Sequence, residues 1–284
     1  MNRISINQAW AYATSFFGDQ HANHAILLIG VGIGGPLLLS ILTGGASAGA
    51  MVTPDQLASG AAIGAISGLA ILAALIGYIL QSGSYFASWR MGLEPGEETI
   101  GSALGYGLVA ALPVLLVSLG FLLLIGILAG MVFGAALFPM LLGNSSQAMS
   151  TGTAGLVLLA LPVFLALLLW LAARFCCMGP VMAASRSLNP LTALAESWRM
   201  TAASQWKLMG YFVLIFIVVI ILSMIVGMVA GVSMLASGGS VTGLSTGALI
   251  IGALLSIPTA YLTVAVPAGI YQALGGTNAG EVFS

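Results

Sequence analysis

The segment ALPVLLVSLGFLLLIGILAG, residues 111–130, carries no charged side chain and is long enough to cross the hydrocarbon core of a membrane as a helix. It belongs to an uncharged stretch that runs from Thr99 to Ala173, and a second such stretch runs from Leu208 to Gly280. A soluble protein does not leave stretches of this length without charge, because its loops must be solvated. Only 5% of the residues are charged and 60% are hydrophobic, so the chain is built for lipid.

Each uncharged stretch is too long for one crossing and divides at a polar, turn-rich segment, 142–153 in the first and 237–246 in the second. Shorter apolar stretches on either side of Asp55 add one span each. The sequence therefore predicts an all-α, polytopic membrane protein with six kinked transmembrane helices. We expect the spans at Ala25 to Thr43, Gly60 to Gln81, Ala103 to Phe133, Thr153 to Arg174, Leu208 to Leu235 and Gly247 to Leu274, with kinks at Pro36, Pro113, Pro162, Pro258 and Pro267.

The basic residues predict how the chain is oriented. With six spans, all six lie on the side that holds both termini, namely Arg3, Arg90, Arg174, Arg186, Arg199 and Lys207. The positive-inside rule makes that side cytoplasmic, which predicts an N-in, C-in topology. The tryptophans gather at the same boundary, where indole rings favour the headgroup region. The predicted interface for lipid or a partner is Trp10, Trp89, Arg90, Arg174, Arg186, Trp198, Arg199, Trp206 and Lys207.

Residues 1–24 are predicted to form an amphipathic helix in the cytoplasmic interface. Ile6, Trp10, Ala13 and Phe17 share one helical face, which lies in the inner leaflet or packs against the protein's own helices. A small-x-small sequence at 46–48 resembles a signal-peptide cleavage site, but the long segment before the apolar run favours an N-terminus that is kept. Residues 25–274 are expected to form one transmembrane domain, followed by a short cytoplasmic tail at 275–284.

Two cytoplasmic connectors share a pattern of an Arg, then Leu-x-Pro, then the start of a helix. They are residues 87–98 and 184–193, and they suggest a weak duplication of residues 60–137 in residues 153–235. After Pro190 the sequence predicts a second amphipathic helix that lies flat in the cytoplasmic interface, with Glu196 and Arg199 spaced to pair.

Rows of glycine recur every fourth residue inside the predicted spans. Such rows let helix backbones approach closely, either within one chain or between subunits, and a pore lining is the less favoured alternative. The predicted packing residues are Gly60, Gly64, Gly68, Gly126, Gly130, Gly134, Gly227 and Gly231.

Residues suited to catalysis or metal binding are sparse. His21 and His24 lie three apart near Cys176 and Cys177 in the predicted topology, but solvated histidines and inert cysteines are favoured over a metal site. The acidic residues Glu94, Glu97 and Glu98 are expected to interact with free amide groups at a helix start. No nucleophile with a base is apparent, so the sequence predicts neither an enzyme nor a cofactor.

The run LNPLTALAESWRMT at 188–201, followed by Trp206, and the opening SINQAW at 5–10 resemble the bacterial six-span YciC-like family. They also resemble the membrane domain fused to some glycerophosphoryl diester phosphodiesterases, without the catalytic domain of those proteins. The resemblance implies a six-span fold and a location in the bacterial inner membrane, and it implies no settled biochemical role.

These observations favour a non-enzymatic membrane protein that organises lipid, or docks a partner, through its cytoplasmic interface. Another membrane protein or a second copy of the chain is the expected kind of protein partner, and no nucleic acid is expected. The alternative is a permease or exporter for a neutral or apolar small molecule. A coupled ion carrier is disfavoured, because no charged side chain or imidazole lies deep in a predicted span.

Overall fold

The computed structural model describes residues 4–43, 68–94, 98–141, 151–236 and 246–275, and the regular elements in these ranges are all helical. Six segments within them are long and apolar enough to cross a membrane, so the chain is a multi-pass membrane protein. These segments are His21–Leu42, Ile71–Leu93, Ile100–Gly134, Val157–Ser185, Pro190–Ile225 and Gly252–Ala273. The predicted all-α class and the number of candidate spans are confirmed.

The first span is a composite of α2, η2 and α3, in which η2 is a π-helix over a glycine-rich segment. The elements are α1 (Ile6–Ser15), η1 (Gly18–Gln20), α2 (His21–Ala25), η2 (Ile26–Gly34), α3 (Gly35–Leu42), α6 (Gly68–Leu93), α7 (Ile100–Leu141), α8 (Thr151–Phe175), α9 (Met178–Ser185), α10 (Pro190–Thr201), η3 (Ala202–Ser204), α11 (Gln205–Ala236) and α12 (Thr246–Ala273).

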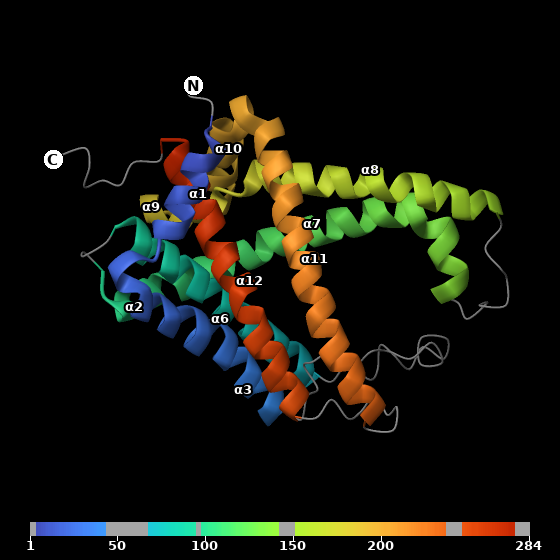
Figure 1. Ribbon diagram of the computed structural model, residues 1–284, viewed down its shortest axis with the longest axis horizontal. Coiled ribbons are helices and arrows are strands. Elements are labelled where there is room, and N and C mark those ends of the chain that lie inside the picture. Colours follow the sequence, from blue (N-terminus) through green and yellow to red (C-terminus); the bar gives the residue numbers. More distant parts are fainter. Residues whose placement is uncertain (1–3, 44–67, 95–97, 142–150, 237–245, 276–284) are drawn as a thin grey trace.

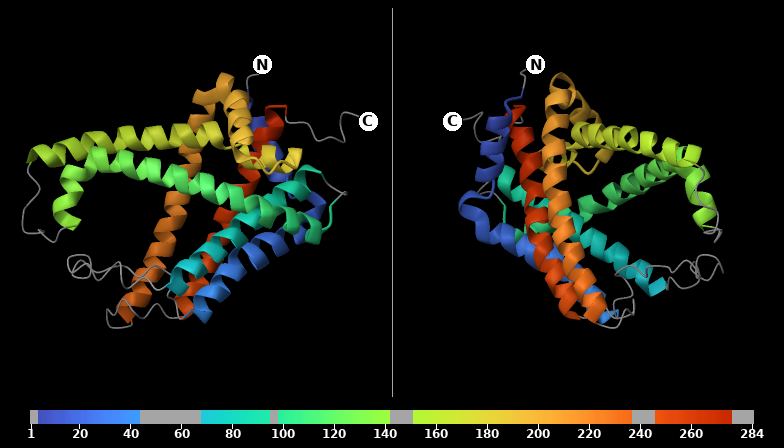
Figure 2. Two further views of the ribbon diagram at one scale, coloured as in Figure 1. Left: turned by 180° about the vertical axis from the view of Figure 1, so that it is seen from behind. Right: turned by 45° about the vertical axis from the view of Figure 1, so that its right-hand side comes forward.

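The helices divide into a packed group and a projecting hairpin (Figure 1). The first span, α6 and α12 lie side by side, and α7 packs against the charged end of α6. From there α7 and α8 run together away from the rest of the molecule, as the two views of Figure 2 show. α11 contacts both α8 and α12. Because α1 packs along the last turns of α12, the beginning and the end of the described chain lie at one end of the molecule.

Local sequence explains where several helices begin. Ser5 caps α1, its hydroxyl accepting a hydrogen bond from the Gln8 amide at 3.4 Å. Asn189 caps α10 in the same way, since its side-chain oxygen accepts from the amides of Leu191 and Thr192. Pro190 occupies the first helical position, where its fixed φ favours a helix and no amide is needed.

The second span differs from its prediction. We expected it to end at Gln81, with a connector from residue 87, but α6 continues as a helix to Leu93. The prediction placed the end of the span before Arg90 because an isolated charge is costly in a membrane. In the structure Arg90 is paired, so the helix continues past it.

Only part of the predicted apolar face of α1 packs against the rest of the protein. Ala9 and Ala13 are buried against α12, where the backbone of α1 lies so close to Gly269 that a Cβ there would meet the Ala9 carbonyl. Ile6 and Trp10 are exposed instead. A face of small residues therefore sets the contact, and the bulky side chains of the helix point outward.

Apolar side chains cover the outside of the long helices. Leu116 of α7, Leu158 of α8 and Met228 of α11 each expose 70% or more of their surface. A helix that is apolar around its whole circumference is stable with this exposure only in lipid. The packed core lies instead at the end formed by α1, α9 and α10.

The described glycines of the predicted rows lie at no helix contact within this chain, and packing between subunits stays a prediction. A Cβ added at Gly68, Gly126, Gly130, Gly134 or Gly227 would meet no atom within 4 Å, so the structure shows no contact within the chain at these positions. Gly60 and Gly64 lie outside the described residues, as do the surroundings of Gly231. Close approach occurs elsewhere. The backbones of α6 and α7 meet at Gly83 and Gly107.

Candidate functional site

Arg90 is the centre of the charged end of the molecule, and only 1% of its surface is exposed. Its Nη2 donates to a carboxylate oxygen of Glu94 at 2.5 Å, and its Nε donates to Glu98 at 3.0 Å. Its Nη1 donates to the carbonyl of Ala183 at 2.8 Å. The planar guanidinium therefore joins the end of α6, the start of α7 and the end of α9.

Arg186 binds the same two carboxylates from the outside. Its Nη2 lies 2.8 Å from Glu98 and 3.7 Å from Glu94, and 60% of its side chain is exposed. The residue takes a left-handed backbone conformation, with φ of 51°, where α9 ends. Arg90, Glu94, Glu98 and Arg186 form what we call the ion-pair cluster. It brings together the two connectors whose sequence patterns look alike, although their duplication stays a prediction.

Further hydrogen bonds hold the cluster in place. The Tyr106 hydroxyl of α7 lies 2.7 Å from the Met182 carbonyl and 3.1 Å from the Ser187 carbonyl, one on each side of Arg186. The Ser102 hydroxyl donates to Glu98 at 2.5 Å. This bond is the main cause of a lowered pKa for Glu98, which the charges of Arg90 and Arg186 lower further against an opposing effect of desolvation. Glu98 is therefore ionised at neutral pH.

The acidic residues thus differ from their predicted role. Glu94 and Glu98 form ion pairs with arginines rather than interacting with free amide groups at a helix start. Glu97 lies outside the described residues. The i, i+4 spacing of Arg90 and Glu94 is the sequence signal that could have revealed the pair.

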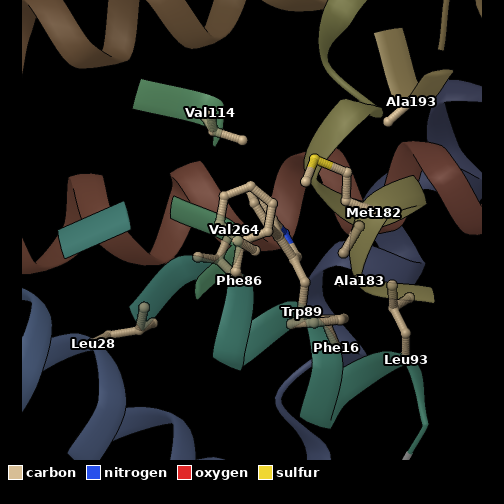
Figure 3. Close-up of a cluster of buried hydrophobic side chains, with 12 residues drawn as sticks. Phe16, Leu28, Phe86, Trp89, Leu93, Val114, Met182, Ala183, Ala193 and Val264 are labelled. Atoms are coloured by element: carbon tan, nitrogen blue, oxygen red, sulfur yellow. The ribbon is translucent and has the colours of Figure 1, made fainter. Parts of the chain in front are cut away.

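Trp89 is buried beside the cluster, so it is not part of an exposed interface as predicted. Its indole ring lies among Phe86, Met182 and Val264 (Figure 3), and its N–H donates to the Val264 carbonyl at 2.9 Å. A Cβ at Gly179 would collide with this ring, so only glycine fits there. Trp89 therefore packs α6 against α9 and α12.

Arg174 is also buried, at the end of α8. Its guanidinium lies 4.0 Å from the centre of the Trp198 ring and donates to the Thr201 hydroxyl at 3.2 Å. Its carbonyl accepts a hydrogen bond from the hydroxyl of Ser197 at 2.8 Å. These contacts fix α10 against the end of α8. Like Arg90, Arg174 therefore has a structural role inside the molecule and does not lie on its surface.

Six of the nine predicted interface residues do lie on the surface. They come from α1, the loop after α9, α10 and the start of α11, which gather at one end (Figure 1). Trp206 exposes 71% of its surface and Trp10 exposes 47%. We call this set the basic–tryptophan surface: Trp10, Arg186, Trp198, Arg199, Trp206 and Lys207.

His24 is buried, whereas the sequence predicts a solvated histidine. Its Nδ1 lies 2.6 Å from the Ser88 hydroxyl, while its Nε2 has no partner among the described residues. Both side chains are fully enclosed, and the rings of Phe16 and Phe17 lie against the imidazole. A serine hydroxyl and an imidazole in this enclosure have no access to a substrate, so we assign the pair a packing role.

The cysteines and histidines are not assembled into a metal site in the part of the chain that the structure describes. His21 stacks on Tyr261, away from Cys176 and Cys177, whose sulfur atoms lie 3.7 Å apart. Cys177 is fully buried against α11 and α12. Soft metals need further ligands than this pair of thiols provides.

No family model, no curated protein and no solved structure matches this chain.

Proposed function

We propose that this protein is a non-enzymatic, multi-pass protein of the bacterial inner membrane, whose basic–tryptophan surface binds anionic lipid headgroups on the cytoplasmic side. One observation carries the proposal: exposed indole rings and exposed cations occur together on α1, α10 and the start of α11. These elements meet at one end of the molecule (Figure 1). Indole rings favour the headgroup region of a bilayer, and each nearby cation contributes about 1 kcal/mol of attraction to an anionic leaflet.

The pairing of the described charges supports an anionic ligand. Among the charged side chains that the structure describes, five cations stand against three carboxylates, which are Glu94, Glu98 and Glu196. Each of these carboxylates already contacts an arginine. Arg174 and Lys207 contact no carboxylate among the described side chains. Of these two only Lys207 is exposed, so it is the cation on this surface that can meet an anionic headgroup.

The rigidity of the same end also supports the proposal. The ion-pair cluster fixes Arg186, and the contacts of Arg174 fix Trp198 on α10. Trp10 meets Tyr211 edge to face at 6.5 Å, which joins α1 to α11. A surface whose groups are held in place loses little conformational entropy on binding, which favours specific lipid contacts over loose ones.

The proposal is tested by the lipids that stay bound after purification in mild detergent, counted by native mass spectrometry. We expect phosphatidylglycerol or cardiolipin to be retained over phosphatidylethanolamine. The double variant Trp206→Ala, Lys207→Gln should reduce this preference about fivefold. That is the change expected when one lysine near an anionic leaflet loses its charge. The control Leu158→Ala removes an equally exposed apolar side chain far from the surface and should change nothing.

Equal retention of anionic and zwitterionic lipids would contradict the proposal. So would a stoichiometric protein partner whose loss, rather than the loss of lipid, follows the double variant. In that case the surface docks a protein.

A further inference from the structure

A cleft of about 510 Å³ lies between α3, α6 and α12, in the half of the spans away from the ion-pair cluster. All of its lining residues belong to membrane-spanning segments, so it opens within the depth of the membrane. Glycines from three elements line it, namely Gly32 of η2, Gly77 of α6 and Gly252 of α12, and a Cβ at Gly252 would meet no atom within 4 Å. The volume is that of a site for a small organic molecule.

The polar groups of the cleft are uncharged. Ser40, Tyr78, Gln81 and Ser256 line it, together with apolar side chains. The Tyr78 hydroxyl bonds that of Ser118 at 3.0 Å, and the Ser256 hydroxyl donates to the Ala253 carbonyl at 2.7 Å. A charged ligand would find no counter-ion among these residues, so the chemistry selects a neutral one.

Ser40 lines the cleft with an unpaired hydroxyl. Only 8% of its surface is exposed, and its hydroxyl has no hydrogen-bond partner among the described residues. An unsatisfied hydroxyl in an apolar setting is unfavourable, and buried polar groups in native proteins are usually paired. A ligand oxygen in the cleft would satisfy it.

The backbone of the cleft wall is irregular in the same place. Gly32 and Ile33 belong to the π-helix η2, whose nine residues are followed by Pro36, another lining residue. π-helical segments are rare and occur frequently at functional sites. This observation is independent of the unpaired hydroxyl.

From these features we infer that the cleft binds one uncharged lipid that carries a hydroxyl or ester oxygen, of the diacylglycerol kind. The lipid oxygen bonds to Ser40 while the acyl chains follow the apolar walls out into the bilayer. The cleft lies apart from the basic–tryptophan surface, and the inference does not rest on the function proposed for that surface.

Photolabelling in lipid nanodiscs tests this site. The probe is a diacylglycerol with a diazirine on one acyl chain, and the labelled peptides are identified by mass spectrometry. We expect labelling of residues 32–40 and 252–256, displaced by unlabelled diacylglycerol and not by phosphatidylglycerol. Ser40→Ala should weaken the competition by about fivefold, the change that loss of one hydrogen bond brings.

Gly252→Leu should abolish the labelling because it fills the cleft, and a Cβ there meets no atom within 4 Å, so the helix tolerates it. Gly126→Leu is the matched control, since that glycine also has open space beside it but does not line the cleft. Equal competition by phosphatidylglycerol, or equal labelling of the wild type and of both leucine variants, would show contact with bulk lipid only and overturn the inference.

Discussion

Arg90 shows how one residue can reverse an expectation drawn from charge. The cost of placing a lone charge in a membrane predicts that the chain surfaces near Arg90, and the structure instead gives its guanidinium two carboxylates and a carbonyl. A buried guanidinium is stable when its nitrogens are paired, and removal of a partner leaves a buried charge uncompensated. The ion-pair cluster is therefore where single substitutions should have their largest effect.

Arg90→Met should destabilise the protein by about 3 kcal/mol, because it leaves two partly buried carboxylates without their central partner. Thermal unfolding in detergent micelles measures the change. Arg199→Met is the control, since Arg199 pairs with Glu196 on the solvent-exposed face of α10 and its removal should have little effect. Similar losses for both variants would show that Arg90 does not stabilise the fold as proposed.

Glu98 predicts a dependence on pH. Its pKa is lowered by the hydrogen bond from Ser102 and then by Arg90 and Arg186, so the folded state favours its ionised form. The stabilisation is complete above the ordinary value of 4.5 and is lost as the pH falls through the lower value of the folded state. Unfolding curves between pH 7 and pH 3 should thus show Glu98→Gln less stable than the wild type at neutral pH, with the difference closing in acid. A constant difference would contradict this assignment.

At the scale of the elements, the contact between α6 and α7 depends on glycine at the crossing point. A Cβ at Gly107 would meet the Gly83 carbonyl and the Ala87 amide nitrogen, whereas one at Gly126 on the same helix would meet nothing within 4 Å. Gly107→Ala should therefore cost about 1 to 3 kcal/mol through overpacking. Gly126→Ala should gain about 0.5 to 1 kcal/mol through helix propensity. The free energies of unfolding of the two variants are compared with that of the wild type in the same detergent. A change of the same sign for both variants would contradict close contact of α6 and α7 at Gly107.

The sequence predicts the elements better than their contacts. The gaps between charges locate six spans because crossing a membrane requires length and apolarity, which are local properties. A row of glycines shows only that one face of a helix is small. Gly126, Gly130 and Gly134 form such a row and have open space beside them, while Gly107 lies at a contact and belongs to no predicted row. The neighbour of a face depends on how distant segments pack, and one sequence does not carry that information locally.

At the scale of the whole molecule, the structure separates groups that the sequence placed together. Tryptophan and arginine at one boundary predict an interface, and the exposed part of it is the basic–tryptophan surface. Trp89, Arg90 and Arg174 follow the same pattern in sequence, yet they are buried because they contact partners from α9, α10 and α12. Burial of this kind is a tertiary property. The projecting hairpin of α7 and α8 is likewise a feature that periodicity does not predict.

The central claim is that the charged end of this six-span protein faces the cytoplasm, and labelling of single cysteines tests it most directly. With Cys176 and Cys177 replaced by alanine, cysteines at Asn7 of α1 and Ala203 of η3 occupy exposed positions on two elements of that end. A membrane-impermeant maleimide should label both in inside-out vesicles and neither in intact spheroplasts. Labelling of either position from outside, or of the two positions from opposite sides, would contradict the account.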